Sequence, residues 1–328
     1  MVRASRAFKS QAFRPLKKAV LFFAAISHCF FALVAPRASH AAEAATASDE
    51  IVVASYNLEN YIRMDRREGN EHLKNAPKPE KEINALIRVI TDINPDILGV
   101  CEMGTRDLFD DFKTRLKNAG LGYTDFEYVD GPDPQRHVAL VSRFPITSRQ
   151  SIPNASYELN GQQEKVRRGF LDVTVKINSD YELRLVGAHL KSKLNDVAEG
   201  EALVRRSESH LLREHIDEIL SKKPDAKLLV YGDFNDTKNE PVIEEIMGTR
   251  NSPAHLTDLW LRDKAGDHWT EYWKAADVYS RIDFIFVNRA LLPDVVQSKS
   301  SVYRSEYWNE ASDHRPVVAT IRVAGNKQ

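Results

Sequence analysis

The sequence has few of the residues that mark specialised classes of protein. Its 328 residues include only two cysteines, Cys29 and Cys101, and glycine and proline number 14 each. That is too little glycine and proline for a collagen-like or low-complexity chain. The HExxH, GxSxG and Walker A motifs are absent, and so are paired CxxC motifs. The composition is that of an ordinary globular protein, long enough for one large domain or two of average size.

An excess of positive charge is also missing from most of the chain. The whole sequence has 46 basic and 47 acidic residues, but residues 1–41 contain seven of the basic ones and no acidic one. The remainder therefore has 39 basic and 47 acidic residues, a net charge of −8. A protein that coats polyanions generally has the opposite sign. We therefore expect any phosphate-containing ligand to be held locally, with the help of a metal ion.

Residues 1–41 have the three-part layout of a secretory signal peptide. A basic lead is followed by an apolar run from Ala19 to Ala35, and Ser39 and Ala41 place small residues before a cut after Ala41. We predict export to the periplasm or the extracellular space. The alternative is a retained membrane anchor, since the apolar run is near the shortest length that spans a bilayer. Cleavage would leave Cys101 as the sole cysteine, so we expect no intrachain disulfide.

The remaining chain reads as a polar lead-in segment at 42–50 and a single mixed α/β domain over 51–324. Apolar residues at helical spacing predict helices over 82–93, 105–119 and 199–220. Short β-favouring runs predict strands at 51–56, 96–101, 138–142, 170–177, 181–190, 227–231, 282–287 and 316–323. Two packed sheets with helices outside fit this order, and so does an ordinary three-layer sheet. The stretches 60–80, 151–166 and 251–280 are expected to be irregular, and loops of that length usually have a function.

Polar side chains recur where the hydrophobic strands begin or end. They are Asn57, Glu102, His189, Asp233, Asn235, Asp283, Asp313 and His314. Packed strands can bring these residues to one sheet edge, where crowded carboxylates repel one another and lose solvation. A hard divalent cation relieves both effects, and oxygen ligands suit Mg²⁺ or Mn²⁺ rather than a thiolate zinc site. The two histidines are then available for proton transfer or for holding a phosphate oxygen.

The neighbours of these residues form six ordered motifs. They are Ser55-Tyr56-Asn57-Leu58-Glu59, Gly99-Val100-Cys101-Glu102, Gly187-Ala188-His189-Leu190, Gly232-Asp233-Phe234-Asn235, Arg281-Ile282-Asp283-Phe284-Ile285 and Ser312-Asp313-His314-Arg315-Pro316-Val317. In this order, over nearly all of 50–323, the chain resembles the endonuclease/exonuclease/phosphatase superfamily, which includes DNase I. The resemblance implies a four-layer α/β/β/α sandwich, with two packed β-sheets flanked by helices, and a metal-dependent hydrolase acting on phosphate esters.

The resemblance also implies a metal site. Glu102 would be the main ligand, with Asn57 and Asp313 completing the set. The implied metal is Mg²⁺ or Mn²⁺, and the number of metal ions is left open.

Catalytic roles follow from the same resemblance. Asp233 and Asn235 would position or activate the attacking water, and His314, oriented by Asp283, would contact the scissile phosphate or transfer a proton. His189 would stabilise the charged phosphate or protonate the leaving oxygen. The general base is open between Asp233 and His314.

Several basic residues are candidates for binding the substrate phosphate. Arg167 and Arg168 precede a strand in the region where DNase I-like members place a phosphate-binding arginine, and Lys191 follows His189. The alternative for these residues is a solvated strand end. Arg205 and Arg206, on the long predicted helix, are expected to face solvent.

Two aromatic segments precede the last two motifs. They contain Trp269, Tyr272, Trp273 and Tyr279 in the first segment and Tyr303, Tyr307 and Trp308 in the second. These residues could stack on bases, touch a lipid interface or form small satellite cores.

The sequence therefore favours a secreted, divalent-metal-dependent phosphodiesterase, and a nuclease above other kinds. The alternatives are a sphingomyelinase-like lipid phosphodiesterase, a sugar- or inositol-phosphate phosphatase, and a non-catalytic binding protein on the same fold. Apurinic endonucleases differ from this chain at His189, which disfavours abasic-site repair. Nucleic acid is the expected partner, with membrane contact only for a lipid substrate and no protein partner inferred. The leaving group and the endo or exo mode stay open.

Overall fold

Two six-stranded sheets form the centre of the computed structural model, which describes residues 49–193 and 199–323. The predicted signal peptide at 1–41 and most of the lead-in segment at 42–50 lie outside the described residues. The first sheet has the order β17 (Ser301–Val302), β18 (Val317–Arg322), β1 (Glu50–Tyr61), β4 (Ile97–Met103), β6 (His137–Ser142) and β5 (Asp125–Val129). The second has the order β13 (Leu256–Asp258), β16 (Asp283–Asn288), β12 (Leu228–Asp233), β11 (Glu182–His189), β10 (Phe170–Lys176) and β7 (Ile146–Arg149).

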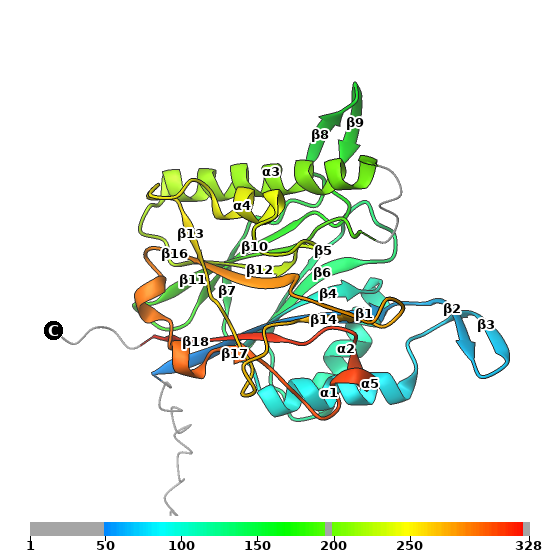
Figure 1. Ribbon diagram of the computed structural model, residues 1–328. Coiled ribbons are helices and arrows are strands. Elements are labelled where there is room, and N and C mark those ends of the chain that lie inside the picture. Colours follow the sequence, from blue (N-terminus) through cyan, green and yellow to red (C-terminus); the bar gives the residue numbers. More distant parts are fainter. Residues whose placement is uncertain (1–48, 194–198, 324–328) are drawn as a thin grey trace, which may run out of the picture. The chain divides into compact units, whose positions relative to one another are not determined.

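Helices cover the outer faces of both sheets (Figure 1). α1 (Glu80–Ile93) and α2 (Arg106–Asn118) pack on the first sheet, while α3 (Glu199–Lys222) and α4 (Pro241–Met247) pack on the second. The short α5 (Trp308–Ala311) contacts α1. Two 3₁₀ turns, Leu292–Asp294 and Gln297–Lys299, complete the helical elements of the described residues. The predicted four-layer α/β/β/α sandwich is confirmed.

The alternation of side chains along the strands explains the layers. On β10, Leu171, Val173 and Val175 lie in the core between the two sheets, together with residues of the first sheet such as Ile51 and Ile97. Phe170 points the other way and packs with residues of α3 and α4. Because successive strand residues face opposite sides, each buried sheet has two apolar faces. The three-layer alternative is therefore wrong, since the first sheet and not a helix layer covers the inner face of the second.

Three stretches that were expected to be irregular contain β-hairpins. They are β2 (Met64–Glu68) with β3 (Glu71–Ala76), β8 (Ser156–Leu159) with β9 (Gln162–Lys165), and β14 (Glu271–Trp273) with β15 (Val278–Ser280). Their residues are mostly exposed or half-buried. A hairpin without a buried face lacks the apolar alternation that predicts a strand, so these strands could not be recognised from the sequence pattern.

Two properties of the described residues bear on the predictions. No helix among them is both long enough and apolar enough to cross a membrane. Cys101, the one cysteine they contain, is buried and free.

Asp172, on β10, is a buried carboxylate paired with two bases. Its oxygens accept hydrogen bonds from Nε and Nη2 of Arg184 at 2.8 and 2.6 Å, and His215 Nε2 lies 2.8 Å from Oδ2. Burial raises the pKa of Asp172, but the bonds from His215 and Arg184 outweigh burial and hold this pKa below the ordinary 3.8. The charged carboxylate therefore stabilises the fold above pH 4, and this contribution is lost as the pH falls through the lowered pKa.

We predict that Asp172→Ala lowers the free energy of unfolding by about 3 kcal/mol at pH 7, because Arg184 and His215 lose their shared acceptor. Urea unfolding at pH 7 and pH 3 measures the effect, and the difference from the native protein should shrink at pH 3. Asp180→Ala, which removes an exposed acid, is the control. An equal loss at both pH values would contradict the pairing.

Candidate active site

The polar strand-end residues meet at one edge of the two sheets. In the second sheet, Asp233 of β12 is paired in register with His189 of β11 and with Asp283 of β16. In the first sheet, Asn57 on β1 donates a hydrogen bond from Nδ2 to Asp233 Oδ2 at 2.9 Å. This bond joins the two sheets at the site, so the site includes residues of both.

Two histidines flank the buried Asp233. His189 Nε2 lies 3.6 Å from Asp233 Oδ2 and 4.0 Å from Glu102 Oε1. His314 Nε2 lies 3.9 Å from the same Asp233 oxygen and 3.8 Å from Asp313 Oδ1. The structure thus brings these five predicted residues, Asp233 included, together in one cluster.

The two imidazoles have opposite electrostatic environments. Burial lowers the pKa of His314, but Asp283, whose Oδ2 lies 2.8 Å from Nδ1, outweighs burial and raises this pKa well above its ordinary value. Burial and the nearby Arg168 lower the pKa of His189. These environments favour the charged form of His314 and the neutral form of His189. Two titratable groups whose pKa values are shifted in opposite directions are typical of groups with different roles in one reaction.

The segment that carries His314 is fixed by Ser312. The Ser312 hydroxyl donates to the Asn57 carbonyl oxygen at 2.8 Å and accepts from the His314 backbone N–H at 3.0 Å. This serine links the end of β1 to the residues that precede β18.

The carboxylates of the site carry uncompensated negative charge. Burial and the neighbouring Asp283 raise the pKa of Asp233, and burial raises that of Asp313, with Glu102 adding to it. Burial and Asp313 raise the pKa of Glu59 to about 7. Oδ1 of Asp313 is buried without a hydrogen-bond partner. Orphaned oxygen atoms among crowded carboxylates fit a hard divalent cation.

Two sets of residues could hold such a cation. The ligand atoms of Asp233, Asp283 and His314 lie within 4.8 Å of one another. Asp283 and His314 are already bonded to each other, however, and a protonated imidazole cannot ligate a metal. The oxygen atoms of Glu102 and Asp313, the ligands expected from the sequence, fit a cation better.

Strained backbone shapes this part of the site. Glu59, Asn60, Glu102 and Asn235 have φ values of 47, 58, 59 and 52°, in the left-handed region. The pairing of β4 with β1 shifts register between Asn57 and Tyr61. The Asn60 N–H donates to Glu102 Oε2 at 2.7 Å, which fixes the Glu102 side chain. Backbone strain of this kind is concentrated at functional sites, where it changes the direction of functional side chains.

Gly232 allows β12 to approach β11 closely. Its φ is +145°, and a Cβ there would lie 1.8 Å from the Ala188 carbonyl oxygen. Only glycine fits, and the close approach sets Asp233 opposite His189. Asn235, two residues on, donates from its N–H to Asp233 Oδ1 at 2.9 Å and from Nδ2 to the Leu190 carbonyl oxygen at 3.0 Å.

The predicted phosphate-binding residues lie in three different environments. Arg168 is buried, 3.2 Å from Asp133 Oδ2, and its charge acts on His189. Lys191 also acts on His189, and its Nζ lies 2.9 Å from Glu201. Arg167 is exposed. Arg168 and Lys191 are therefore the better placed of the three.

The expectation that Arg205 faces solvent is wrong. Its side chain is buried, with Nε 3.3 Å from Asp236 Oδ2 and Nη1 donating to the Lys191 carbonyl oxygen at 3.2 Å. Arg206 is exposed as expected. Helical periodicity identifies apolar faces, so it missed a charged face that packs on polar loops.

Sequence reasoning missed four more residues near the site. Glu59 stands in a motif that was identified, yet it was given no role. Lys78 is buried and donates to the Glu59 carbonyl oxygen at 2.9 Å. Arg136 bonds Asn60 Oδ1 and acts electrostatically on His189, and Glu271 pairs with His314 in an isolated β-bridge. Lys78 and Arg136 lie between regular elements, where the sequence carries no periodic signal.

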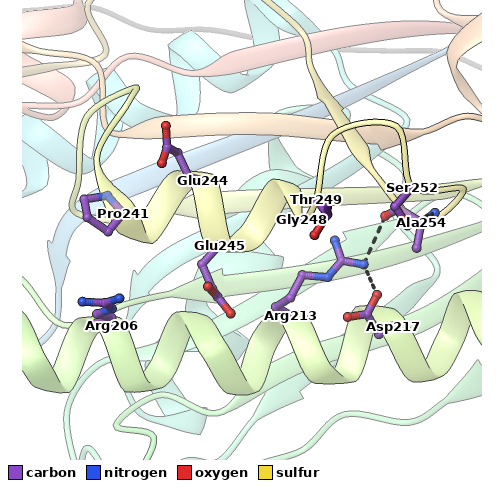
Figure 2. Close-up of a pocket in the computed structure, with 10 residues that line it drawn as sticks. All are labelled: Arg206, Arg213, Asp217, Pro241, Glu244, Glu245, Gly248, Thr249, Ser252 and Ala254. Carbon is purple, nitrogen blue, oxygen red and sulfur yellow. Dashed lines mark hydrogen bonds and ion pairs between the residues drawn. The ribbon is translucent and has the colours of Figure 1, made fainter.

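A separate surface cavity of about 480 Å³ lies between α3 and α4 (Figure 2). Arg213 lines this cavity and donates hydrogen bonds to Asp217 and to the Ala254 carbonyl oxygen. The bond to Ala254 links α3 to the loop after α4. None of the predicted site residues lines this cavity.

Known proteins share this fold. Similar solved structures include a truncated TDP2 from Caenorhabditis elegans (18% identity, TM-score 0.57, 84% of this chain and 98% of that one). The human Nocturnin catalytic domain with bound sulfate is 19% identical, with a TM-score of 0.58, and the match covers 83% of this chain and 94% of that one. Beta toxin from Staphylococcus aureus is 16% identical, with a TM-score of 0.55, and the match covers 82% of this chain and 99% of that one. At these identities the likeness shows the fold alone, and no curated protein matches the chain.

The family comparison is more specific. The model of the Endonuclease/Exonuclease/phosphatase family matches residues 54–314, which include every predicted catalytic and metal-binding residue. Members of this family are hydrolases of phosphate esters and use divalent metals. The chain belongs to the Endonuclease/Exonuclease/phosphatase family.

Proposed function

We propose that this hydrolase is an exported, Mg²⁺- or Mn²⁺-dependent phosphodiesterase, and specifically a nuclease. One observation carries the proposal: the buried Asp233 carboxylate lies between His189 and His314, and Asp283 holds the His314 ring. Hydrolysis of a diester requires a base for the attacking water and a donor for the leaving alkoxide oxygen. The arrangement supplies both functions within one cluster.

Asp233 is the better general base of the two candidates. His314 is held in its protonated form by Asp283, so it cannot take a proton from water. The raised pKa of Asp233 makes its carboxylate a stronger base than an ordinary aspartate. The water proton would pass to Asp233 as the new P–O bond forms. As the old P–O bond breaks, the leaving oxygen would take a proton from His314.

Glu102 and Asp313, together with Asn57, which also donates to Asp233, would hold the divalent cation. When bound, such a cation offsets negative charge on the phosphoryl oxygens and positions the ester. Three positive side chains whose charges act on His189, namely Arg136, Arg168 and Lys191, supply the local charge that the acidic chain lacks overall.

Glu208 positions the segments that carry these cations. It is fully buried on α3, and its two oxygens accept the backbone N–H groups of Arg167 at 3.1 Å and Lys191 at 2.7 Å. Arg205, one turn earlier, holds the Lys191 carbonyl oxygen. The buried charged face of α3 thus ties together the loop before β10 and the loop after β11.

The leader at 1–41 supports export. We predict that the exported protein begins at Ala42, because small residues precede that bond. Intact-mass measurement of the protein released by the native host checks this. A chain that retains residues 1–41 in the membrane fraction would support the anchor instead.

We predict that His314→Ala lowers kcat by at least about 100-fold, because the leaving oxygen loses its proton donor. The assay follows hydrolysis of plasmid DNA, RNA, sphingomyelin and bis-p-nitrophenyl phosphate with Mg²⁺, Mn²⁺ or EDTA. EDTA should abolish activity, and circular dichroism should show that the variant keeps its fold. His210→Ala, at an exposed histidine of α3, should match the native enzyme.

The substrates separate the alternatives. Cleavage of DNA or RNA supports the nuclease, whereas activity on sphingomyelin alone would replace it with a lipid phosphodiesterase. A His314→Ala variant with native kcat would exclude the assigned role of this residue.

We predict that Glu208→Ala raises KM for the nucleic acid about 10-fold, with a smaller change in kcat, because the cationic loops lose their shared acceptor. Glu214→Ala, an exposed acid on the same helix, should change neither constant. Steady-state kinetics with both variants measures the effect. A fall in kcat with KM unchanged would show that Glu208 acts on the reacting groups and not on substrate binding.

A further inference from the structure

The hairpin β14–β15 exposes an unusual amount of apolar surface. Among the described residues, six large hydrophobic side chains are exposed, and three of them belong to this hairpin. They are Trp273, Val278 and Tyr279, with 48, 44 and 52% of their surface accessible. A concentration of apolar side chains on one short exposed element indicates a surface that binds something.

Main-chain bonds fix this hairpin to the catalytic segment. The Tyr272 N–H donates to the Asp313 carbonyl oxygen at 2.8 Å, and Glu271 pairs with His314 in a β-bridge. The Arg315 N–H donates to the Thr270 carbonyl oxygen at 2.6 Å, just before β14. The hairpin therefore lies directly beside the site.

One face of the hairpin is turned toward the reacting groups. Residues paired in register share a face, so Trp273 and Val278 lie on the side of Glu271 and Ser280. Glu271 is close enough for the charges of His314, Asp283 and Asp313 to act on its carboxylate. Trp273, two residues along the strand, stands about 7 Å further from the catalytic cluster on the same face.

Ring contacts support the opposite face of the hairpin, although 52% of the Tyr279 surface is accessible. Tyr272 and Tyr279 stack with ring centroids 4.4 Å apart and planes at 20°. Trp269 contacts Tyr279 at 4.8 Å and Trp308 at 5.0 Å, and the guanidinium of Arg315 lies 3.4 Å from the centre of the Trp269 ring. These contacts hold the side chains behind the hairpin and leave the face of Trp273 presented to the site.

We propose that Trp273, flanked by Val278, is the stacking surface for the nucleobase that adjoins the scissile phosphate, and that the substrate is unpaired nucleic acid. This inference rests on the proposed nuclease function. A base can offer its ring face to a side chain only when it is unpaired and unstacked, and one aromatic ring is enough to bind it. The distance along the strand from Glu271 to Trp273, about 7 Å, suits the base nearest to the scissile phosphate.

The charge of the hairpin favours a base over a lipid surface. A membrane-binding element combines apolar residues with basic ones. This hairpin carries Glu271 and Asp277 against Lys274 alone. The acidic balance disfavours an anionic membrane surface, whereas stacking needs no charge on the side chain.

Two single-stranded oligonucleotides test the proposal. One has ordinary bases, and the other has tetrahydrofuran residues in place of the nucleosides on both sides of the cleaved linkages. Stacking contributes about 1–3 kcal/mol per base, so Trp273→Ala should lower kcat/KM for the first oligonucleotide by about 5- to 140-fold. It should leave kcat/KM for the second unchanged, and Trp273→Phe should restore most of the loss. Trp260→Ala, at the other exposed tryptophan, is the matched control.

Each contrary outcome has a distinct meaning. If the native enzyme cleaves both oligonucleotides equally well, or if Trp273→Ala affects both equally, the stacking surface is excluded while the nuclease survives. If neither oligonucleotide is cleaved, the nuclease and this inference both fail. Loss of binding of Trp273→Ala to sphingomyelin-containing vesicles, with hydrolysis of that lipid by the native enzyme, would overturn the inference in favour of a lipid surface.

Discussion

Repulsion between buried carboxylates is the constraint on which the rest of this structure depends. Asp233, Asp283, Asp313, Glu59 and Glu102 converge at one sheet edge, and burial raises the pKa of three of them. Positive and polar neighbours compensate part of the negative charge of these carboxylates. His314 is held protonated by Asp283, the buried Lys78 lies against Glu59, and Asn57 donates to Asp233. A divalent cation fits the part of the cluster that these groups leave uncompensated.

The positive side of the site is organised differently. Burial, together with the charges of Arg168, Arg136 and Lys191, lowers the pKa of His189. The loops that carry Arg168 and Lys191 are held by the buried face of α3 through Glu208 and Arg205, and Arg136 bonds Asn60. The acidic half of the site is thus set by strand ends and strained backbone, while the basic half depends on helix-to-loop contacts. The substrate phosphate would bind where the two halves meet.

The sequence predicted the strands and the acidic half well because both have local signals. Alternation along 170–177 indicates a strand, and polar residues after 51–56 and 227–231 indicate the strand ends at the site, although β1 continues to Tyr61 and β12 to Asp233. Six ordered motifs relate these ends to one family. The basic half could not be predicted to the same extent. Arg205 looked solvent-facing because charged residues on a helix usually are, and Glu208 gave no signal since its partners are backbone N–H groups far away in the sequence. The exposed hairpins were missed for a related reason, because they bury no alternate side chains.

The order of the strands has a consequence for the chain during synthesis. β1 lies between β4 and β18, so the first strand of the fold pairs with the last. Asn57 precedes Asp313 and His314 by more than three quarters of the chain. A polypeptide that has emerged only as far as residue 312 therefore has most of its core residues but neither the second imidazole nor the final carboxylate. The site forms only when the last strand has been added, so a cell that makes this hydrolase contains no complete active site on its unfinished chains.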